Sequence, residues 1–295
     1  MSPVVILALR DPVQHGCGGG DACSCTGVQL PVLACAEALR AGRAEAEPVT
    51  ADSDAEIDAV VKRVTAGEAR LVVAAASNAE VRAVVRRMVR ALAPSPSRRP
   101  DDLPANRTIY DLPPLAILPL RTTPPPLCGA LRLPTTPADV ARATLDGRVR
   151  RWDLLRTEGS VTLQGLLLGG IDGDTPAPLR ARIEVDDTVL TDGSEPLLAV
   201  AVTNTGSSDV DGLPLVPEAD GTDGVVEVAV AVPMLRRRLV RAADVRVEVR
   251  RARGRAMSVT PHEDTLRCVD DGVVGPITRK RSWWTEPGAW ATYQG

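Results

Sequence analysis

Aromatic residues and lysines are scarce in this sequence of 295 residues. It contains no phenylalanine and two tyrosines, and Lys62 and Lys280 are its only lysines, so nearly all of its positive charge is arginine. Together with abundant alanine, valine, glycine and proline, this pattern indicates coding bias rather than function. The net charge of −3 excludes a chain that is attracted as a whole to nucleic acid or to anionic membranes.

Long hydrophobic runs are also missing. The longest apolar stretches, such as residues 112–120, fall far short of the ~20 residues that span a bilayer. The N-terminus lacks the basic and then apolar pattern of a secretory signal. We therefore expect a cytoplasmic protein without a transmembrane segment. Six cysteines do not make a disulfide framework in a chain of this size, so they are expected to be thiols or metal ligands.

The clearest structural signal is a strand, a turn and a helix over residues 70–92. Residues 70–76 form a short apolar run typical of a buried strand, and Ser77 with Glu80 has the spacing of a capping box. The helix that follows has one apolar stripe, made of Val81, Val84, Val85, Met88, Val89 and Leu92. In an open α/β sheet, ligands bind at the turn after a strand's carboxyl end. This turn is therefore the first candidate site.

The rest of the N-terminal part repeats this alternation, which predicts a Rossmann-like α/β domain. Strands are expected at 4–9, 45–49 and 115–120, with helices after Val28 and Ser53. Cys35 falls on the apolar stripe of the first helix and is expected in the core. The proline-rich residues 93–114 are predicted to be a mobile surface flap.

Near Gly147 the pattern changes to short strands between Gly, Asp, Pro and Ser turns. This spacing predicts a second domain that is mainly antiparallel, a β-sandwich or an open barrel. One short helix with an arginine-rich face is expected at Met234–Ala242. A chain of this length is long enough to bury two cores.

Four segments carry a family resemblance: LPPLAILPL at 112–120, LRLPTTPADVARATLDGRVRRWD at 131–153, residues 197–228 with LPLVPEADGTDGVVEV, and residues 253–276 with RGRAMSVTP and DDGVVGP. Together these segments resemble the bacterial diacylglycerol kinase and lipid kinase family, whose fold is similar in outline to that of NAD kinases. The resemblance implies an α/β nucleotide-binding-like domain made of residues 1–147 and 277–295, and a β-rich domain of residues 148–276. It also implies ATP with magnesium as cofactor and a nucleotide or a lipid as partner; a homo-oligomer stays open.

The positions that carry the family's chemistry are altered in this chain. The family's Gly-Gly-Asp-Gly-Thr turn corresponds to Ala75, Ala76, Ser77, Asn78 and Ala79, and its Gly-Thr-Gly-Asn turn to Arg121, Thr122 and Thr123, followed by prolines that lack N–H donors. The acid of its Asp-Gly-Glu turn corresponds to Val273, which cannot accept a proton. The resemblance therefore implies lipid kinase ancestry with weak or absent phosphotransfer, as in a pseudoenzyme. The alternative is a non-catalytic binding or regulatory module.

Two further sets of charged residues have both a functional and an ordinary explanation. Asp153, Glu218, Asp220 and Asp223 could position a metal, or they could be solvated turn acids. Arginines at 86, 87 and 90, at 236–238 and at 279 and 281 could meet phosphate or lipid headgroups, or they could form solvated faces.

A glycine-rich loop brings His15, Cys17, Cys23 and Cys25 within eleven residues. One imidazole and three thiolates suffice for tetrahedral zinc or for part of an iron–sulfur site. The C-x5-C-x-C spacing matches no common zinc or ferredoxin signature, so a redox-sensitive dithiol and ordinary reduced cysteines stay open as alternatives.

The metal hypothesis predicts that the purified protein carries zinc or iron without added metal. Ordering about ten glycine-rich residues costs of order 10 kcal/mol in backbone entropy, and a structural zinc site can contribute a similar amount. Elemental analysis of the wild type and of a Cys23→Ser, Cys25→Ser variant is the measurement. A metal content well below one ion per chain, or a variant that keeps its metal, would contradict the hypothesis.

Overall fold

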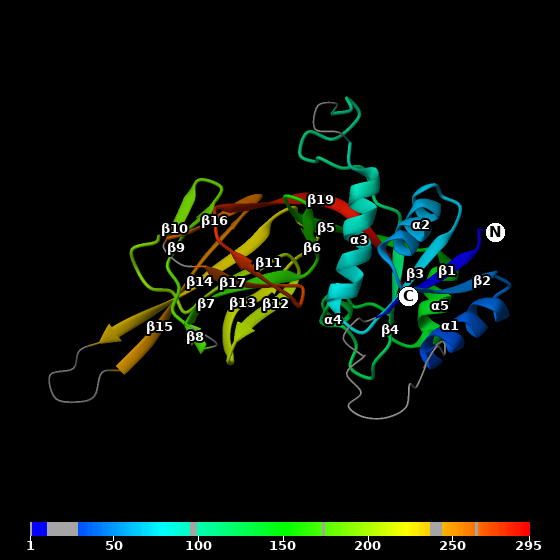
Figure 1. Cartoon of the computed structure of the whole chain (residues 1–295), viewed down its shortest axis with the longest axis horizontal. Coiled ribbons are helices and arrows are strands. Elements are labelled where there is room, and N and C mark those ends of the chain that lie inside the picture. Colours follow the sequence, from blue (N-terminus) through cyan, green and yellow to red (C-terminus); the bar gives the residue numbers. More distant parts are fainter. Residues whose placement is uncertain (1, 11–28, 95–98, 173–174, 237–243, 263–264) are drawn as a thin grey trace. The chain divides into compact units, whose positions relative to one another are not determined.

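The computed structural model describes residues 2–10, 29–94, 99–172, 175–236, 244–262 and 265–295 (Figure 1). The chain divides into two compact units. Unit 1 comprises residues 1–93, 111–151 and 290–295, and unit 2 comprises residues 94–110 and 152–289. None of the helices in the described ranges is both long and apolar enough to cross a membrane.

Unit 1 is built on a parallel sheet with the strand order β19-β4-β3-β1-β2. Its strands are β1 (Val4–Leu9), β2 (Ala46–Ala51), β3 (Arg70–Ala75), β4 (Leu115–Pro119) and the C-terminal end of β19 (Arg281–Tyr293). Its helices are α1 (Leu30–Ala41), α2 (Asp54–Thr65), α3 (Asn78–Leu92), α4 (Pro126–Ala130) and α5 (Pro137–Asp146). Helix α1 contacts α5, and α2 contacts α3. The predicted alternation of strands and helices is confirmed.

Local sequence explains where these helices begin and end. Ser53 and Glu56 form a capping box at α2, and Ser77 and Glu80 form one at α3. Helix α5 ends at Gly147, whose φ of 68° lies in the left-handed region that glycine adopts freely. Cys35 is fully buried in the core between α1 and the sheet, as its position on the apolar stripe predicts.

All the regular elements described in unit 2 are strands. One sheet has the order β15-β14-β11-β7-β17-β18, with β8 paired to β7; a second series runs β10-β9-β16-β19, with β5 paired to β19 and β6; and β12 pairs with β13. The strand pairs described within unit 2 are antiparallel. The mixed α/β and antiparallel β architecture is therefore as predicted.

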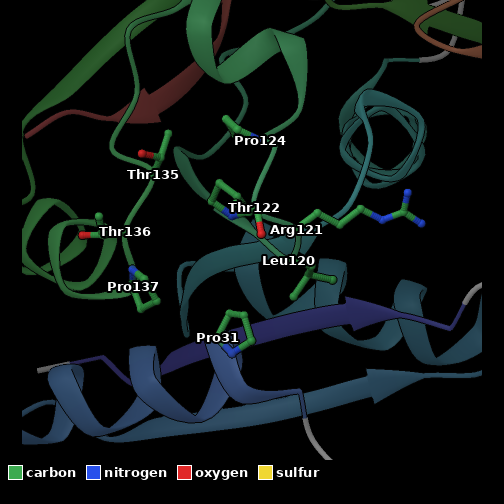
Figure 2. A pocket seen from close by; sticks show the side chains of 9 residues that line it. Pro31, Leu120, Arg121, Thr122, Pro124, Thr135, Thr136 and Pro137 are labelled. Atoms are coloured by element: carbon green, nitrogen blue, oxygen red, sulfur yellow. The ribbon is translucent and has the colours of Figure 1, made fainter.

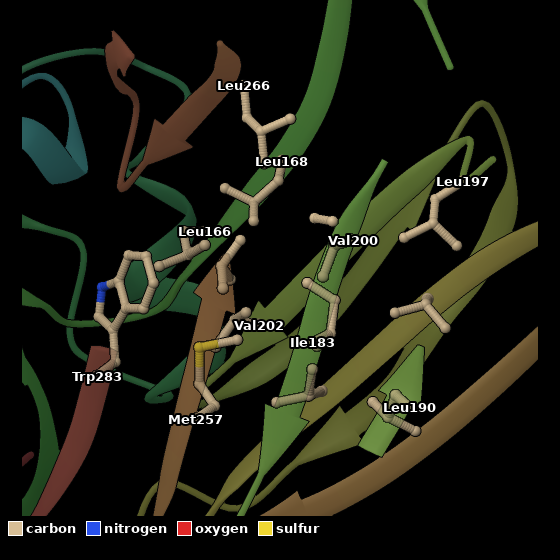
Figure 3. Packing of buried hydrophobic residues seen from close by; sticks show 14 of the residues in the cluster. Leu166, Leu168, Ile183, Leu190, Leu197, Val200, Val202, Met257, Leu266 and Trp283 are labelled. Atoms are coloured by element: carbon tan, nitrogen blue, oxygen red, sulfur yellow. The ribbon is translucent and has the colours of Figure 1, made fainter. Parts of the chain in front are cut away.

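The strands of unit 2 are β5 (Val149–Thr157), β6 (Ser160–Thr162), β7 (Gly165–Asp172), β8 (Thr175–Ala177), β9 (Ala181–Val185), β10 (Thr188–Asp192), β11 (Ala199–Thr203), β12 (Gly206–Val210), β13 (Leu213–Ala219), β14 (Val226–Arg236), β15 (Asp244–Gly254), β16 (Ala256–Pro261), β17 (Leu266–Asp270), β18 (Val273–Ile277) and most of β19. Strands β5 and β19 carry residues of both units. In the hydrophobic core of unit 2, Trp283 and Met257 belong to the same cluster as Leu166 and Val202 (Figure 3).

Two predictions for individual segments are wrong. Met234–Arg236 belongs to strand β14 and not to a helix; the rest of the predicted helix lies outside the described residues. The proline-rich segment is not a free flap in its described part, because Leu103 and Ile109 are buried and Thr108 is hydrogen-bonded to Glu286.

A buried carboxylate fixes the turn between β17 and β18. Asp271 accepts the backbone N–H groups of Leu163, Gln164 and Gly165, with N···O distances of 2.6, 3.0 and 3.3 Å. Burial, and to a lesser degree the neighbouring carboxyl of Asp270, raises the pKa of Asp271 to about 7, although the three N–H donors act in the opposite direction.

This raised pKa predicts a pH-dependent stability. Because the folded state holds the Asp271 proton more tightly than the unfolded state, the free energy of unfolding should fall as the pH rises from about 4 to about 7. This fall should total a few kcal/mol, as expected for a pKa shift of this size, and replacing Asp271 with Asn should remove most of it. Urea unfolding between these pH values measures it. The exposed Asp209→Asn is the control, and an equal slope in Asp271→Asn and the wild type would contradict the prediction.

Candidate functional site

The first predicted site is the turn from β3 into α3. Ala75 ends the strand, and Ser77 is the N-cap residue of α3 with extended backbone angles. The carboxylate of Glu80 accepts the N–H groups of both Ala76 and Ser77, with a distance of 3.2 Å to the Ser77 nitrogen. Two of the N–H groups at this turn, those of Ala76 and Ser77, are therefore bonded to a negative side chain of the same helix.

The first and second predicted turns are connected through Asn78. Its side chain is only 8% exposed, and its Oδ1 accepts the Leu127 N–H at 3.1 Å. Leu127 lies in the first turn of α4, which begins at Pro126 with Pro125 as its N-cap residue. The structure thus brings the segment after β4 to the turn after β3. There the Leu127 N–H group is already bonded to the side-chain oxygen of Asn78.

A cavity of about 440 Å³ lies at the carboxyl end of β4 (Figure 2). Of the predicted nucleotide-binding residues, Arg121 and Thr122 line it, whereas Thr123 and the turn at 75–79 do not. Its complete lining is Pro31, Pro119, Leu120, Arg121, Thr122, Pro124, Thr135, Thr136 and Pro137.

In the described part of the chain, the lining of the cavity offers no general acid or base. Its lining contains no carboxylate, imidazole or thiol among the described residues. The Thr136 hydroxyl is bonded to Asp139, where it caps α5. Arg121 is exposed, and in Figure 2 its side chain extends away from Thr135 and Thr136. It can supply a positive charge at the edge of the cavity, while the prolines and Leu120 supply apolar walls.

Three of the four acids suggested for metal positioning, Asp153, Asp220 and Asp223, bond to other groups of the chain. Asp153 is 1% exposed and accepts the N–H groups of Gly224 at 2.6 Å and Gly288 at 2.7 Å. Burial raises its pKa, and Asp223 and Asp220 add to this effect. Within the described ranges, no group of three His, Cys, Asp or Glu side chains could hold a metal ion. The predicted metal residues His15, Cys17, Cys23 and Cys25 lie outside the described residues.

Val273, which the sequence resemblance assigns to the position of the family's catalytic acid, lies at the surface. The turn is formed by Asp271 and Gly272, with φ angles of 48° and 86°, and Val273 begins β18 with 40% of its surface exposed. The adjacent carboxylate of Asp271 is buried and bonded to backbone N–H groups. It is therefore not available to a substrate at the surface.

Sequence reasoning missed a buried ionic cluster in unit 2. Glu286 on β19 is fully buried and accepts the Thr108 N–H at 2.6 Å, the Trp284 indole N–H at 2.9 Å and an Arg156 N–H at 3.1 Å. The Arg156 guanidinium also lies 5.4 Å from the centre of the Trp284 ring. Alternation along the strand indicates which face Glu286 occupies, but no local pattern signals a partner 178 residues away. The cluster holds the proline-rich segment to unit 2.

No protein-family model matches the chain, and no curated protein matches it in sequence. Three solved structures from Bacillus anthracis str. Sterne match all of it. One, described as a diacylglycerol kinase, shares 14% identity with a TM-score of 0.63 and is covered over 97% of its length. Two others, described as candidate diacylglycerol kinases, share 12% and 13% identity, each with a TM-score of 0.64, and are covered over 97% and 98%. Over its whole length, this chain therefore has the fold of these bacterial diacylglycerol kinase structures.

Proposed function

We propose that this protein is a diacylglycerol-kinase-like member of the lipid kinase superfamily whose phosphotransfer activity is weak or absent. In this proposal unit 1 is a Rossmann-like domain with a degenerate nucleotide site, and unit 2 is a β-sandwich. The fold supports the ancestry, and the contacts of the candidate site support the loss of activity.

The observation that carries the proposal is the position of Glu80. Its carboxylate bonds the N–H groups of Ala76 and Ser77, so a phosphate at this turn would replace one anion by another or lie beside it. Two like charges about 4 Å apart repel by roughly 4 kcal/mol near a protein surface. Phosphoryl transfer depends on positioning and charge neutralisation, and both are opposed here.

Two other features support the same conclusion. Pro124, Pro125 and Pro126 remove three successive N–H donors from the turn after β4. Val273 supplies no base at the place where the resemblance implies one. Each change removes a separate contribution to catalysis, so reversing one of them does not restore the others.

A non-catalytic binding or regulatory module is the second candidate, and the cavity beside Arg121 favours it. Its apolar walls and single positive side chain suit a small anionic ligand, which includes a nucleotide or a lipid headgroup. Zinc or iron at the loop of His15, Cys17, Cys23 and Cys25, and assembly into a homo-oligomer, belong to this candidate as predictions from the sequence.

The charge of Glu80 should control the affinity of the turn for phosphate. Calorimetry with ATP and magnesium should find no micromolar binding to the wild type. Glu80→Gln keeps an oxygen that can accept N–H bonds but removes the charge, so it should bind at least about tenfold more tightly. The matched control is Glu56→Gln, which makes the same change in the capping box of α2. Micromolar binding to the wild type would contradict the prediction.

Phosphotransfer itself can be measured with labelled ATP and diacylglycerol in mixed micelles. The wild type should transfer no more phosphate than a reaction without enzyme, and Val273→Glu alone should not restore transfer because both phosphate turns remain changed. The Bacillus anthracis diacylglycerol kinase serves as the positive control. A wild-type rate close to that of the control would reject the proposal, whereas a thermal shift with ATP but no transfer would favour the binding module.

A further inference from the structure

The cavity at the carboxyl end of β4 is walled mainly by proline. Four of its nine lining residues are prolines, and they come from α1, from β4 with the segment after it, and from α5. Figure 2 shows Pro31, Pro124 and Pro137 around the same opening. The cavity volume of about 440 Å³ lies within the range of about 300–1,000 Å³ that is usual for small-molecule sites.

The prolines make the cavity poor in the backbone donors that bind phosphate. Phosphate sites use free N–H groups at the beginnings of helices, and proline has no N–H group. Pro31 and Pro137 occupy the first turns of α1 and α5, the two helices that begin at the cavity. The N–H group of Asp139 is already bonded to the Thr136 hydroxyl at 3.2 Å, and that of Val32 to a backbone carbonyl at 2.9 Å. A phosphate would therefore meet fewer N–H donors here than a helix terminus usually offers.

The charge beside the cavity comes from one arginine. Arg121 lines the cavity, its side chain is exposed, and no acid in the described part of the chain pairs with it. Its side chain extends away from Thr135 and Thr136 in Figure 2, and because exposed side chains change rotamer within nanoseconds, it can turn to a ligand at the mouth. One guanidinium matches one carboxylate, to which it can donate two parallel N–H bonds. It does not neutralise the several charges of a nucleoside triphosphate.

Rigid proline walls favour a flat aromatic ring over a flexible chain. Each pyrrolidine ring has a fixed φ, so it loses little entropy when a ligand covers it. Its C–H groups pack against the negative face of an aromatic ring, the same pairing by which aromatic grooves recognise proline-rich peptides. Thr122 and Thr135 add hydroxyl groups on the exposed side of the cavity.

We propose that this cavity binds a small aromatic monocarboxylate, with the ring between the proline walls and the carboxylate on Arg121. The inference rests on the binding-module candidate of the proposed function and specifies its ligand class as an aromatic acid, in place of a nucleotide or a lipid headgroup. It does not involve Glu80 or the turn at 75–79, which do not line the cavity.

Naphthoate is the probe, and calorimetry with the whole chain measures its dissociation constant. We expect a value on the order of 100 μM for a ligand of this size. Naphthamide keeps the ring without the charge, and decalin carboxylate keeps the charge without the flat ring. Each analogue should bind at least about fivefold more weakly than naphthoate, because each lacks one of the two recognised features.

The charge is tested by replacing Arg121. Arg121→Gln should weaken naphthoate binding about tenfold, through loss of the charge-assisted hydrogen bonds, and should change naphthamide binding far less. The matched control is Arg148→Gln, which removes another exposed arginine of unit 1 beyond the opposite end of α5. This control should change the affinity for neither probe.

The walls are tested by a second pair of variants. Pro124→Ala removes part of one wall and should weaken naphthoate binding about threefold, through loss of apolar contact. Pro126→Ala changes an exposed proline of the same run that does not line the cavity, and it should have no effect. Thermal unfolding of each variant confirms that it folds.

Four results would overturn the inference. They are the absence of naphthoate binding, equal binding of either analogue, equal losses in the variants and their controls, and ATP with magnesium that displaces naphthoate at a similar concentration. Failure of the proposed function is distinguishable from these results. Phosphotransfer to diacylglycerol would reject that function, whereas the naphthoate titrations alone decide the ligand class of the cavity.

Discussion

The N–H groups of Ala76 and Ser77, just before α3, are bonded to Glu80, and this contact bears on the chemistry proposed for unit 1. Every helix begins with N–H groups that need acceptors, and at the carboxyl edge of a parallel sheet a bound phosphate can supply them. Here Glu80 bonds Ala76 and Ser77, and Asn78 bonds Leu127. Two N–H groups beside the helix therefore already have an acceptor, which supports the proposal that a phosphate gains little by binding there.

Unit 2 uses carboxylates in the same way. Asp153 bonds Gly224 and Gly288, Asp271 bonds three successive N–H groups after β6, and Glu286 bonds Thr108. Each of these contacts joins segments that are 71 to 178 residues apart. Buried acids that hold distant segments together are not free to coordinate a metal or accept a proton from a substrate. Their value lies in fixing the connections of unit 2, since leaving such an N–H unbonded in the interior costs about 1–3 kcal/mol.

The structural features that could be predicted from the sequence are those that local residue patterns determine. The apolar run of β3 and the Ser77–Glu80 spacing specify a strand and a capped helix, and both occur. The pairing of Asn78 with Leu127 and of Glu286 with Thr108 depends on contacts across 49 and 178 residues, which no local pattern encodes. The helix predicted at Met234 failed for a related reason. A short apolar and basic stretch fits both periods, and pairing along the β15 ladder decides for the strand.

Backbone geometry permits residues other than glycine at the two predicted phosphate turns. None of the residues at 75–79 or 121–126 has a positive φ, so these turns do not need glycine for conformational reasons. Glycine is favoured there only where a ligand must approach the backbone closely. Once that requirement is absent, alanine at 75 and 76 stabilises the folded chain by roughly 0.4–1 kcal/mol per site, because the unfolded chain has fewer conformations to lose. Under the proposed function, loss of phosphate binding and gain of stability thus act in the same direction at these two positions.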